Sequence, residues 1–171
     1  MTVMYEGRPD VHYGFFDVCA GVEPDGDLIE ARQGQVNGLC GAKSDHRLAM
    51  VTGLHTGDVP LRIEWHPDEP RLDPQWEDVV EASLDVSSPD GMLISFEDGA
   101  ELTFPRTGWH RARYCAAGMD EGKDLDTPDE GELVPDRYLL QLWPAPATPD
   151  EVVKESSAIA GYWHRVARGE A

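Results

Sequence analysis

The fold is decided by residues 77–104, which read EDVVEASLDVSSPDGMLISFEDGAELTF. Apolar and polar residues alternate over 77–86, and a period of two is the pattern of a β-strand with one buried face. The residues expected on that face are Val80, Ala82, Leu84 and Val86. The turn-forming run 88–91 follows, so a second strand is expected to begin close behind the first.

A β-hairpin is predicted in the second half of this stretch. Met92, Ile94 and Phe96 are expected to line one face of a short strand, and residues 101–104 form its partner. Asp98-Gly99 lies between the two strands, and Asp-Gly is favoured in two-residue hairpin turns because both positions need positive φ.

Further strands are predicted on both sides, at residues 11–20, 47–54, 60–66, 109–117 and 137–143, with a weaker one over 31–42. On the first of these, the side chains expected to face the core are Val11, Tyr13, Phe15 and Cys19. The last has apolar residues on both faces, which is typical of a central strand covered twice. An acidic turn at 23–27 and a proline-rich loop at 66–74 separate strands. Closely spaced strands predict an antiparallel β-sandwich of seven to nine strands.

One helix is predicted, over residues 149–168. Thr148 can cap it, Pro149 suits its first turn and Glu151 completes a capping box. The apolar stripe that would pack on one face of the sandwich, as the cover of the last strand, consists of Val152, Ile159, Trp163 and Val166.

A length of 171 residues predicts one domain, 1–171, made of a sandwich over about 8–144, the helix 149–168 and an acidic loop at 118–136. Three cysteines without framework spacing fit a reducing compartment. The first residues lack the pattern of a signal peptide, and no stretch approaches 18 apolar residues. The expected location is therefore the cytoplasm.

Charge is the unusual property of the chain, with 33 Asp and Glu against 14 Lys and Arg and a formal net charge of −19. Such a field repels nucleic acid and anionic membranes and attracts cationic proteins. Solubility alone, or adaptation to salt, would also explain the charge. The sequence favours a non-enzymatic acidic binding protein with a basic protein partner, no nucleic acid and no membrane.

The acids gather between two predicted strands, in segment 118–136, where Lys123 is the one basic residue. The candidate contact residues are Asp120, Glu121, Asp124, Asp126, Asp129, Glu130 and Glu132. Asp124-Leu125-Asp126 resembles the start of a calcium loop, but Pro128 stands where the next ligand is needed. A solvated acidic loop is the alternative to a docking surface.

The sequence also offers residues for two other kinds of site. Trp65, Trp76 or Trp109 could form a stacking platform for a small molecule or carbohydrate, and Cys40 with His46 or His55 could form a hydrolase site. The six histidines form no zinc-ligand pair, and neither a dinucleotide fingerprint nor a P-loop is present. No catalytic residue, cofactor or metal is predicted. Arg111 and Arg113 are expected to pair with acids on a neighbouring strand.

Three segments carry a family resemblance: Asp10–Val18, an aromatic-rich opening strand; Leu102–Ala112, a turn leading into the penultimate strand; and Asp136–Trp143, a final strand. Together they resemble the competence protein J family, inhibitors of the DNA-entry nuclease. The chain is also similar to a group of actinobacterial proteins of unassigned activity that share the ending Asp-Arg-Tyr-Leu-Leu-Gln-Leu-Trp-Pro. The competence protein J resemblance implies a β-sandwich of inhibitor or immunity-protein type, and therefore a basic partner such as a nuclease or toxin.

Overall fold

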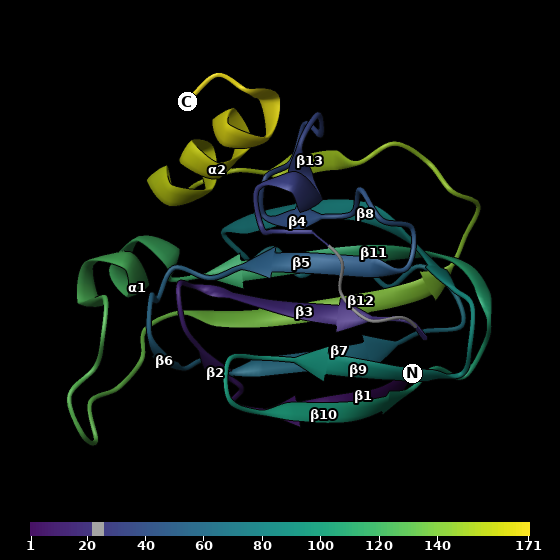
Figure 1. Cartoon of the computed structure of the whole chain (residues 1–171), viewed down its shortest axis with the longest axis horizontal. Helices are drawn as coiled ribbons and strands as arrows, with labels where there is room; N and C mark the ends of the chain where they lie inside the picture. Colours follow the sequence, from purple (N-terminus) through teal and green to yellow (C-terminus); the bar gives the residue numbers. More distant parts are fainter. Residues whose placement is uncertain (22–25) are drawn as a thin grey trace.

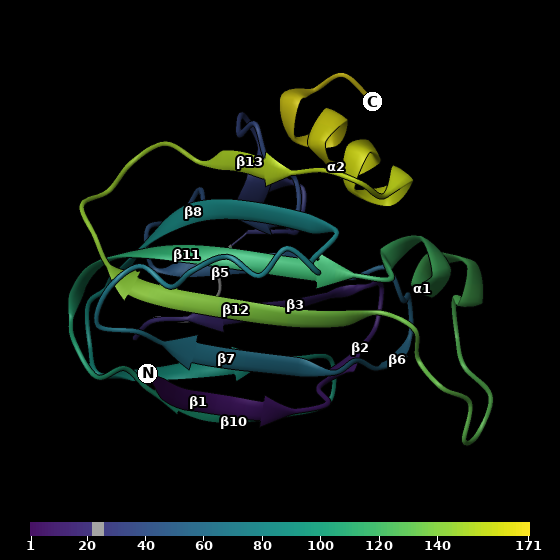
Figure 2. The same cartoon turned by 180° about the vertical axis from the view of Figure 1, so that it is seen from behind.

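A computed structural model describes residues 1–21 and 26–171. Two β-sheets face each other, one of six strands and one of five, with a small third sheet of two strands beside them (Figures 1 and 2). The predicted mainly-β architecture with a C-terminal helix is confirmed. The described residues form thirteen strands rather than seven to nine, because several are only two residues long. The acidic turn predicted at 23–27 falls largely outside the described residues.

The six-stranded sheet has the order β1-β7-β12-β11-β8-β13. Its strands are β1 (Thr2–Gly7), β7 (Leu61–Trp65), β8 (Asp78–Val86), β11 (Gly108–Ala117), β12 (Arg137–Pro144) and β13 (Glu151–Lys154). All its pairings are antiparallel except that of β12 with β7, which is parallel. The prediction of a purely antiparallel sandwich is therefore wrong at this one ladder. The expected central position of 137–143 is confirmed, since β12 lies between β7 and β11.

The five-stranded sheet has the order β10-β9-β3-β5-β4. Its strands are β3 (Phe15–Cys19), β4 (Cys40–Gly41), β5 (Arg47–Val51), β9 (Asp90–Ile94) and β10 (Gly99–Thr103). The small sheet pairs β2 (Asp10–Val11) with β6 (Gly57–Asp58). A 3-10 turn, η1 (Glu30–Arg32), and the two-residue β4 occupy the segment where a weak strand was expected over 31–42.

The core lies between the two large sheets. Phe16 of β3 meets Tyr114 of β11 edge to face, with ring centroids 6.1 Å apart, and Tyr114 stacks on Tyr138 of β12 at 5.6 Å. The Tyr114 hydroxyl donates across the sandwich to the Val51 carbonyl at 2.9 Å. Burial of each such ring removes large apolar surface from water, which stabilises the fold by roughly 25 cal/mol per Å² buried.

Two predictions of register need correction. On the first predicted strand, Phe16 and Val18 face the core, whereas Tyr13 is exposed because the chain turns there before β3 begins. In the β9–β10 hairpin, Leu93 is the buried residue and Met92 is exposed. The hairpin exists, but Gly99 pairs with Ile94, so its loop has four residues, 95–98, instead of the two predicted.

Segment 66–77 covers the outer face of the six-stranded sheet. The prediction that the C-terminal helix covers this face is therefore wrong. Trp76 is buried in a small cluster with Val79 and Cys115. Arg113 donates to the Pro70 carbonyl at 2.7 Å and lies over the Trp143 ring. The proline-rich composition that predicts a loop here is correct, but the loop packs through its own tryptophan.

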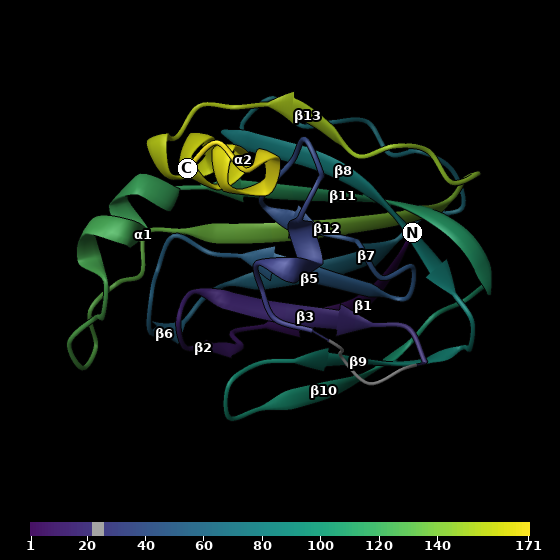
Figure 3. The same ribbon diagram turned by 45° about the horizontal axis from the view of Figure 1, so that its top comes forward.

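The C-terminal helix, α2 (Ala158–Arg168), is shorter than predicted and lies along the edge of the sandwich that β4, β8 and β13 form (Figures 1 and 3). The predicted start at 149 is wrong because residues 151–154 pair with β8, whose edge backbone groups would otherwise lack partners. Asp150 does not start a helix; its Oδ2 instead accepts the amides of Val36 and Asn37. Of the predicted stripe, Ile159 and Trp163 pack against the core, while Val152 belongs to β13.

A second helix, α1 (Met119–Leu125), occupies the start of the segment predicted as an acidic loop. Met119 is fully buried in the core, which ties the helix to the sandwich. Gly118 precedes it with φ 75°, a conformation that glycine adopts without strain. The loop prediction for 118–136 is therefore wrong over its first part and correct over the remainder.

Candidate partner-binding surface

One end of the sandwich collects four connections that are distant in sequence: residues 8–14, 54–58, 95–98 and 118–136, here called the acidic end. It lies on the side of α1, β2 and β6 in Figure 1. Backbone hydrogen bonds join the connections. Phe96 donates to the Asp10 carbonyl at 3.1 Å, and His55 and Thr56 donate to the Asp126 carbonyl at 3.1 and 3.0 Å. The acidic end is therefore one continuous, connected surface.

Negative charge is concentrated there. The 35 residues of the acidic end hold 12 of the 33 Asp and Glu residues and two of the 14 Lys and Arg residues, Arg8 and Lys123. They thus carry a formal −10 of the total −19 in about one fifth of the chain. Closely grouped like charges sum to a potential that spread charges do not reach.

The predicted contact residues fall into two groups by position. Asp120, Glu121 and Asp124 lie on α1, and Asp126, Asp129, Glu130 and Glu132 follow it. All are exposed except Asp120, which is half-buried. Its carboxylate accepts the amides of Ala158 and Ile159 at 2.9 Å each, at the N-terminus of α2. Asp120 is therefore engaged in holding the two helices together.

The segment after α1 is anchored at both ends. The buried Asp136 accepts the amide of Leu54 at 2.9 Å and the hydroxyl of Tyr138. Burial raises the pKa of the Asp136 carboxyl, while the hydrogen bonds from Tyr138 and the backbone lower it. At the other end, the Asp126 carbonyl accepts the amides of His55 and Thr56 at 3.1 and 3.0 Å. A Cβ added at Gly122 would lie 2.7 Å from the Asp136 carboxyl carbon, so α1 can approach Asp136 this closely only with glycine there.

A second acidic group, not singled out from the sequence, completes the surface: Asp10, Asp58, Glu97 and Asp98. Asp10 pairs directly with Asp58 in the β2–β6 ladder, where like charges oppose each other. Burial, followed by the charges of Asp58, Glu97 and Asp98, raises the pKa of Asp10. Arg8 is close by, but its guanidinium donates to the Asp58 backbone carbonyl at 3.0 Å.

Between the two acidic groups lies a cluster of rings, here called the aromatic patch: His12, Tyr13, His55 and Phe96. Tyr13 and Phe96 are 66% and 60% exposed. His12 is the centre, with ring-centroid distances of 4.3 Å to Tyr13, 4.5 Å to Phe96 and 5.7 Å to His55. Sequence periodicity had assigned Tyr13 to the core and Phe96 to a strand face.

The backbone at the aromatic patch is strained. Tyr13 and Asp126 are the two non-glycine residues with positive φ among residues 1–21 and 26–171, at 61° and 60°. Such a conformation costs an L-residue roughly 1–2 kcal/mol. The strain at Tyr13 is held by its neighbour Gly14, which donates to the His55 carbonyl at 2.9 Å and accepts from Thr52 at 2.8 Å.

The two histidines of the patch share one hydroxyl. His12 Nδ1 lies 3.2 Å from Thr56 Oγ1, and His55 Nδ1 lies 2.8 Å from the same atom. A hydroxyl can donate only one hydrogen bond, so at least one of the two rings donates to Thr56 Oγ1. This arrangement fixes the orientation of both rings.

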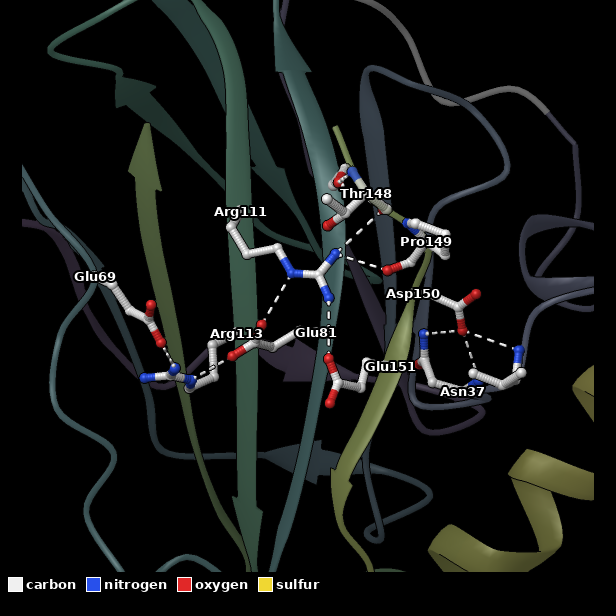
Figure 4. A network of polar contacts seen from close by, with 11 residues as sticks. Asn37, Glu69, Glu81, Arg111, Arg113, Thr148, Pro149, Asp150 and Glu151 are labelled. Carbon is white, nitrogen blue, oxygen red and sulfur yellow. Dashed lines mark hydrogen bonds and ion pairs between the residues drawn. The ribbon is translucent and has the colours of Figure 1, made fainter. Parts of the chain in front are cut away.

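The arginines of the outer sheet face do not neutralise the acidic end, because they are paired elsewhere. Arg111 Nε and Arg113 Nε donate to the two oxygens of Glu81 at 2.9 and 2.8 Å, and Arg113 also meets Glu69 at 2.8 Å (Figure 4). The predicted cross-strand pairing is confirmed. Arg111 further donates to the Pro149 carbonyl at 2.9 Å, which secures the segment leading to β13.

Cys40 lacks the environment of a nucleophile. Its side chain is fully buried, and burial raises the pKa of the thiol to about 12. His46 Nδ1 lies 2.7 Å from the Asp85 carbonyl, and His55 belongs to the aromatic patch. The thiol is therefore neutral at physiological pH, and the hydrolase hypothesis loses its activated nucleophile.

The tryptophans considered as a stacking platform are separated from one another. Trp76 is 8% exposed, and Trp65 is half-buried and donates to His110 Nε2 at 3.1 Å. Trp109 is 38% exposed and lines a depression with Thr148 and Pro149. Burial therefore removes Trp76 as a stacking platform, whereas Trp109 keeps an exposed ring beside this depression.

Within residues 1–21 and 26–171, no three His, Cys, Asp or Glu side chains are placed to hold one ion. In the acidic segment, Asp126 Oδ2 accepts from the Thr127 hydroxyl and Glu132 Oε2 accepts from the Asp129 amide.

Within residues 1–21 and 26–171, no helix is both long and apolar enough to cross a membrane.

Comparison with known proteins gives a likeness of fold. No family model and no curated sequence matches the chain. The crystal structure of ComJ from Bacillus subtilis, described as an inhibitor of the DNA degrading activity of NucA, aligns with a TM-score of 0.56 at 14% identity, covering 84% of this chain and 98% of ComJ. A protein described as crocagin biosynthetic gene J aligns with a TM-score of 0.52 at 10% identity, covering 84% and 100%. The chain therefore shares the fold of a nuclease inhibitor, as the sequence resemblance had led us to expect.

Proposed function

We propose that this protein is a non-enzymatic inhibitor that docks its acidic end on a basic protein, such as a nuclease. The observation that carries the proposal is that the connected segments of the acidic end hold a formal −10, of which all but the charge of the buried Asp136 lies at the surface. A nuclease groove is basic because it holds a polyanion, and clustered carboxylates can occupy it in place of phosphates. The likeness to ComJ, itself a nuclease inhibitor, supports the same role.

The test compares two variants with the same change of charge. The first neutralises exposed acids of the acidic end, Glu121→Gln, Asp124→Asn and Glu130→Gln. The second neutralises exposed acids elsewhere, Asp68→Asn, Asp90→Asn and Glu101→Gln. Asp120 is left intact because its loss would loosen α2. Each immobilised protein is used to capture partners from the native lysate at low salt, followed by elution with a salt gradient.

The expected result is a basic protein retained in stoichiometric amount by the wild type and the second variant, and eluted at clearly lower salt from the first. With the captured protein in hand, DNA degradation is measured with and without the wild type, and inhibition is expected. Affinity for the first variant should fall by about tenfold or more at low salt and converge with the wild type at high salt, because salt screens exposed charges. Equal retention by all three proteins would contradict the proposal.

A further inference from the structure

The aromatic patch has the position that an interaction centre requires. It lies between the acidic group of Asp10, Asp58, Glu97 and Asp98 and the acidic segment after α1, and both are tied to it by backbone hydrogen bonds. Protein interfaces typically place aromatic residues at their centre and polar residues at their rim. Large apolar rings that stand exposed together mark such surfaces.

The backbone conformation of Tyr13 indicates that its exposed ring has a functional role. A turn with positive φ is normally made by glycine, asparagine or aspartate. Tyr13 adopts φ 61° while its side chain is 66% exposed, so burial of the ring does not compensate for the strain. Strain of this kind collects at functional positions, where the surrounding structure maintains it.

A small hollow adjoins the patch and gives it depth. It measures about 170 Å³ and is lined by His12, Phe15, Asp17, Ile94, Ser95 and Phe96. His12 and Phe96 belong both to the hollow and to the aromatic patch.

We propose that the aromatic patch binds an arginine side chain of the basic partner, and this inference rests on the proposed function. A guanidinium stacks on exposed aromatic faces and is less strongly hydrated than an ammonium group. The flanking carboxylates balance its charge. Phosphate-bearing ligands are disfavoured by the local −10, and a second copy of this chain would bring the same negative charge.

The experiment uses labelled nona-arginine and nona-lysine peptides, with binding followed by fluorescence anisotropy at low salt. The test variant is Tyr13→Asn with Phe96→Ser. Asparagine tolerates positive φ, so this variant should fold. The control is Tyr162→Asn with Met92→Ser, which removes exposed apolar side chains outside the acidic end. Circular dichroism and urea unfolding confirm that both fold.

The wild type and the control should bind nona-arginine about three- to tenfold more tightly than nona-lysine. In the test variant this ratio should fall close to one, while nona-lysine affinity stays within about twofold. An unchanged ratio would overturn the inference, because the preference would then come from the carboxylates alone. Self-association of the wild type that the test variant abolishes would also overturn it, in favour of a second copy as the occupant.

The two proposals fail separately in this design. The acidic-end variant with Glu121→Gln, Asp124→Asn and Glu130→Gln should lose affinity for both peptides and keep its preference for arginine. If it binds both peptides as the wild type does, docking through these acids is wrong. If the variant with Tyr13→Asn and Phe96→Ser binds both peptides as the wild type does while the acidic-end variant loses affinity, docking through the acids is supported and the arginine site is wrong.

Discussion

Two buried histidines are held by hydrogen bonds that only a neutral ring can make. His164 Nδ1 accepts the Gly38 amide at 2.9 Å, and His110 Nε2 accepts the Trp65 indole at 3.1 Å. Burial lowers the pKa of both rings. For His164, Glu155, Asp78 and Asp150 oppose this shift and Arg168 adds to it. A proton on either acceptor nitrogen would replace an attraction by a repulsion.

Acid should therefore weaken the attachment of α2 through His164. Since its folded-state pKa is lowered, its contribution to stability is complete above the unfolded value of about 6.5 and is lost as pH falls from there towards the folded value. In His164→Asn, the amide oxygen can still accept from Gly38 but does not titrate. Urea unfolding at pH 7.5 and 5.0 should show a smaller loss for the variant, despite a cost of about 1–2 kcal/mol at pH 7.5. Equal losses in the two proteins would contradict this role.

Tyr13 should contribute nothing to the stability of the fold. Replacement by asparagine relieves part of the cost of positive φ and removes an exposed ring. The free energy of unfolding of Tyr13→Asn should equal that of the wild type or exceed it by up to about 1 kcal/mol. A loss greater than about 1 kcal/mol in urea unfolding would show instead that the ring packs as a structural element.

At the scale of elements, α2 is held at its start by acids from two other parts of the chain. Ser157 caps it, Asp78 accepts the amides of Ser156 and Ser157, and Asp120 accepts those of Ala158 and Ile159. Negative charge at a helix N-terminus meets both the unpaired amides and the positive end of the helix dipole. The attachment of α2 thus depends on α1 and β8.

Asp120→Ala should destabilise the protein by about 1–2 kcal/mol, because two charge-assisted hydrogen bonds at the α2 N-terminus are lost. Glu121→Ala, one residue away and exposed, is the matched control and should change stability little. Urea unfolding gives the free energies, and hydrogen exchange at Ala158 and Ile159 should speed up only in the first variant. Similar behaviour of both variants would argue against the cap.

The strands could be predicted from the sequence better than the helices. The alternation over 77–86 and the two-sided apolar pattern over 137–143 are local information, and the burial of β8 and β12 follows them. The start of α2 could not be predicted, because Asp150 and residues 151–154 have partners far away in sequence. Tyr13 was misassigned since periodicity does not report where a strand begins.

At the scale of the molecule, half of the acidic end was visible in the sequence. Segment 118–136 is acidic in one continuous run and needs no tertiary knowledge. The second acidic group and the aromatic patch combine residues from three distant connections, which only the β2–β6 pairing and the β9–β10 loop bring together. No local pattern marks such a surface in advance.

Concentrated charge should also show in the stability of the whole molecule. Neutralising Glu121, Asp124 and Glu130 relieves repulsion at the acidic end and should raise Tm by about two to four degrees at low salt. Neutralising Asp68, Asp90 and Glu101 should raise it less. The difference should shrink near 1 M salt, where the Debye length is about 3 Å. Calorimetry at two ionic strengths measures this, and equal shifts would indicate evenly spread repulsion.

The parallel ladder between β7 and β12 has a consequence for biosynthesis. β12 fills the place between β7 and β11, although residues 61–65 and 108–117 precede it along the chain. Before residues 137–144 are synthesised, the edges of β7 and β11 that pair with β12 have no partner strand. Such edges attract other strands. Folding of this protein during synthesis should therefore depend on chaperones that cover the edges of β7 and β11 until β12 pairs with them.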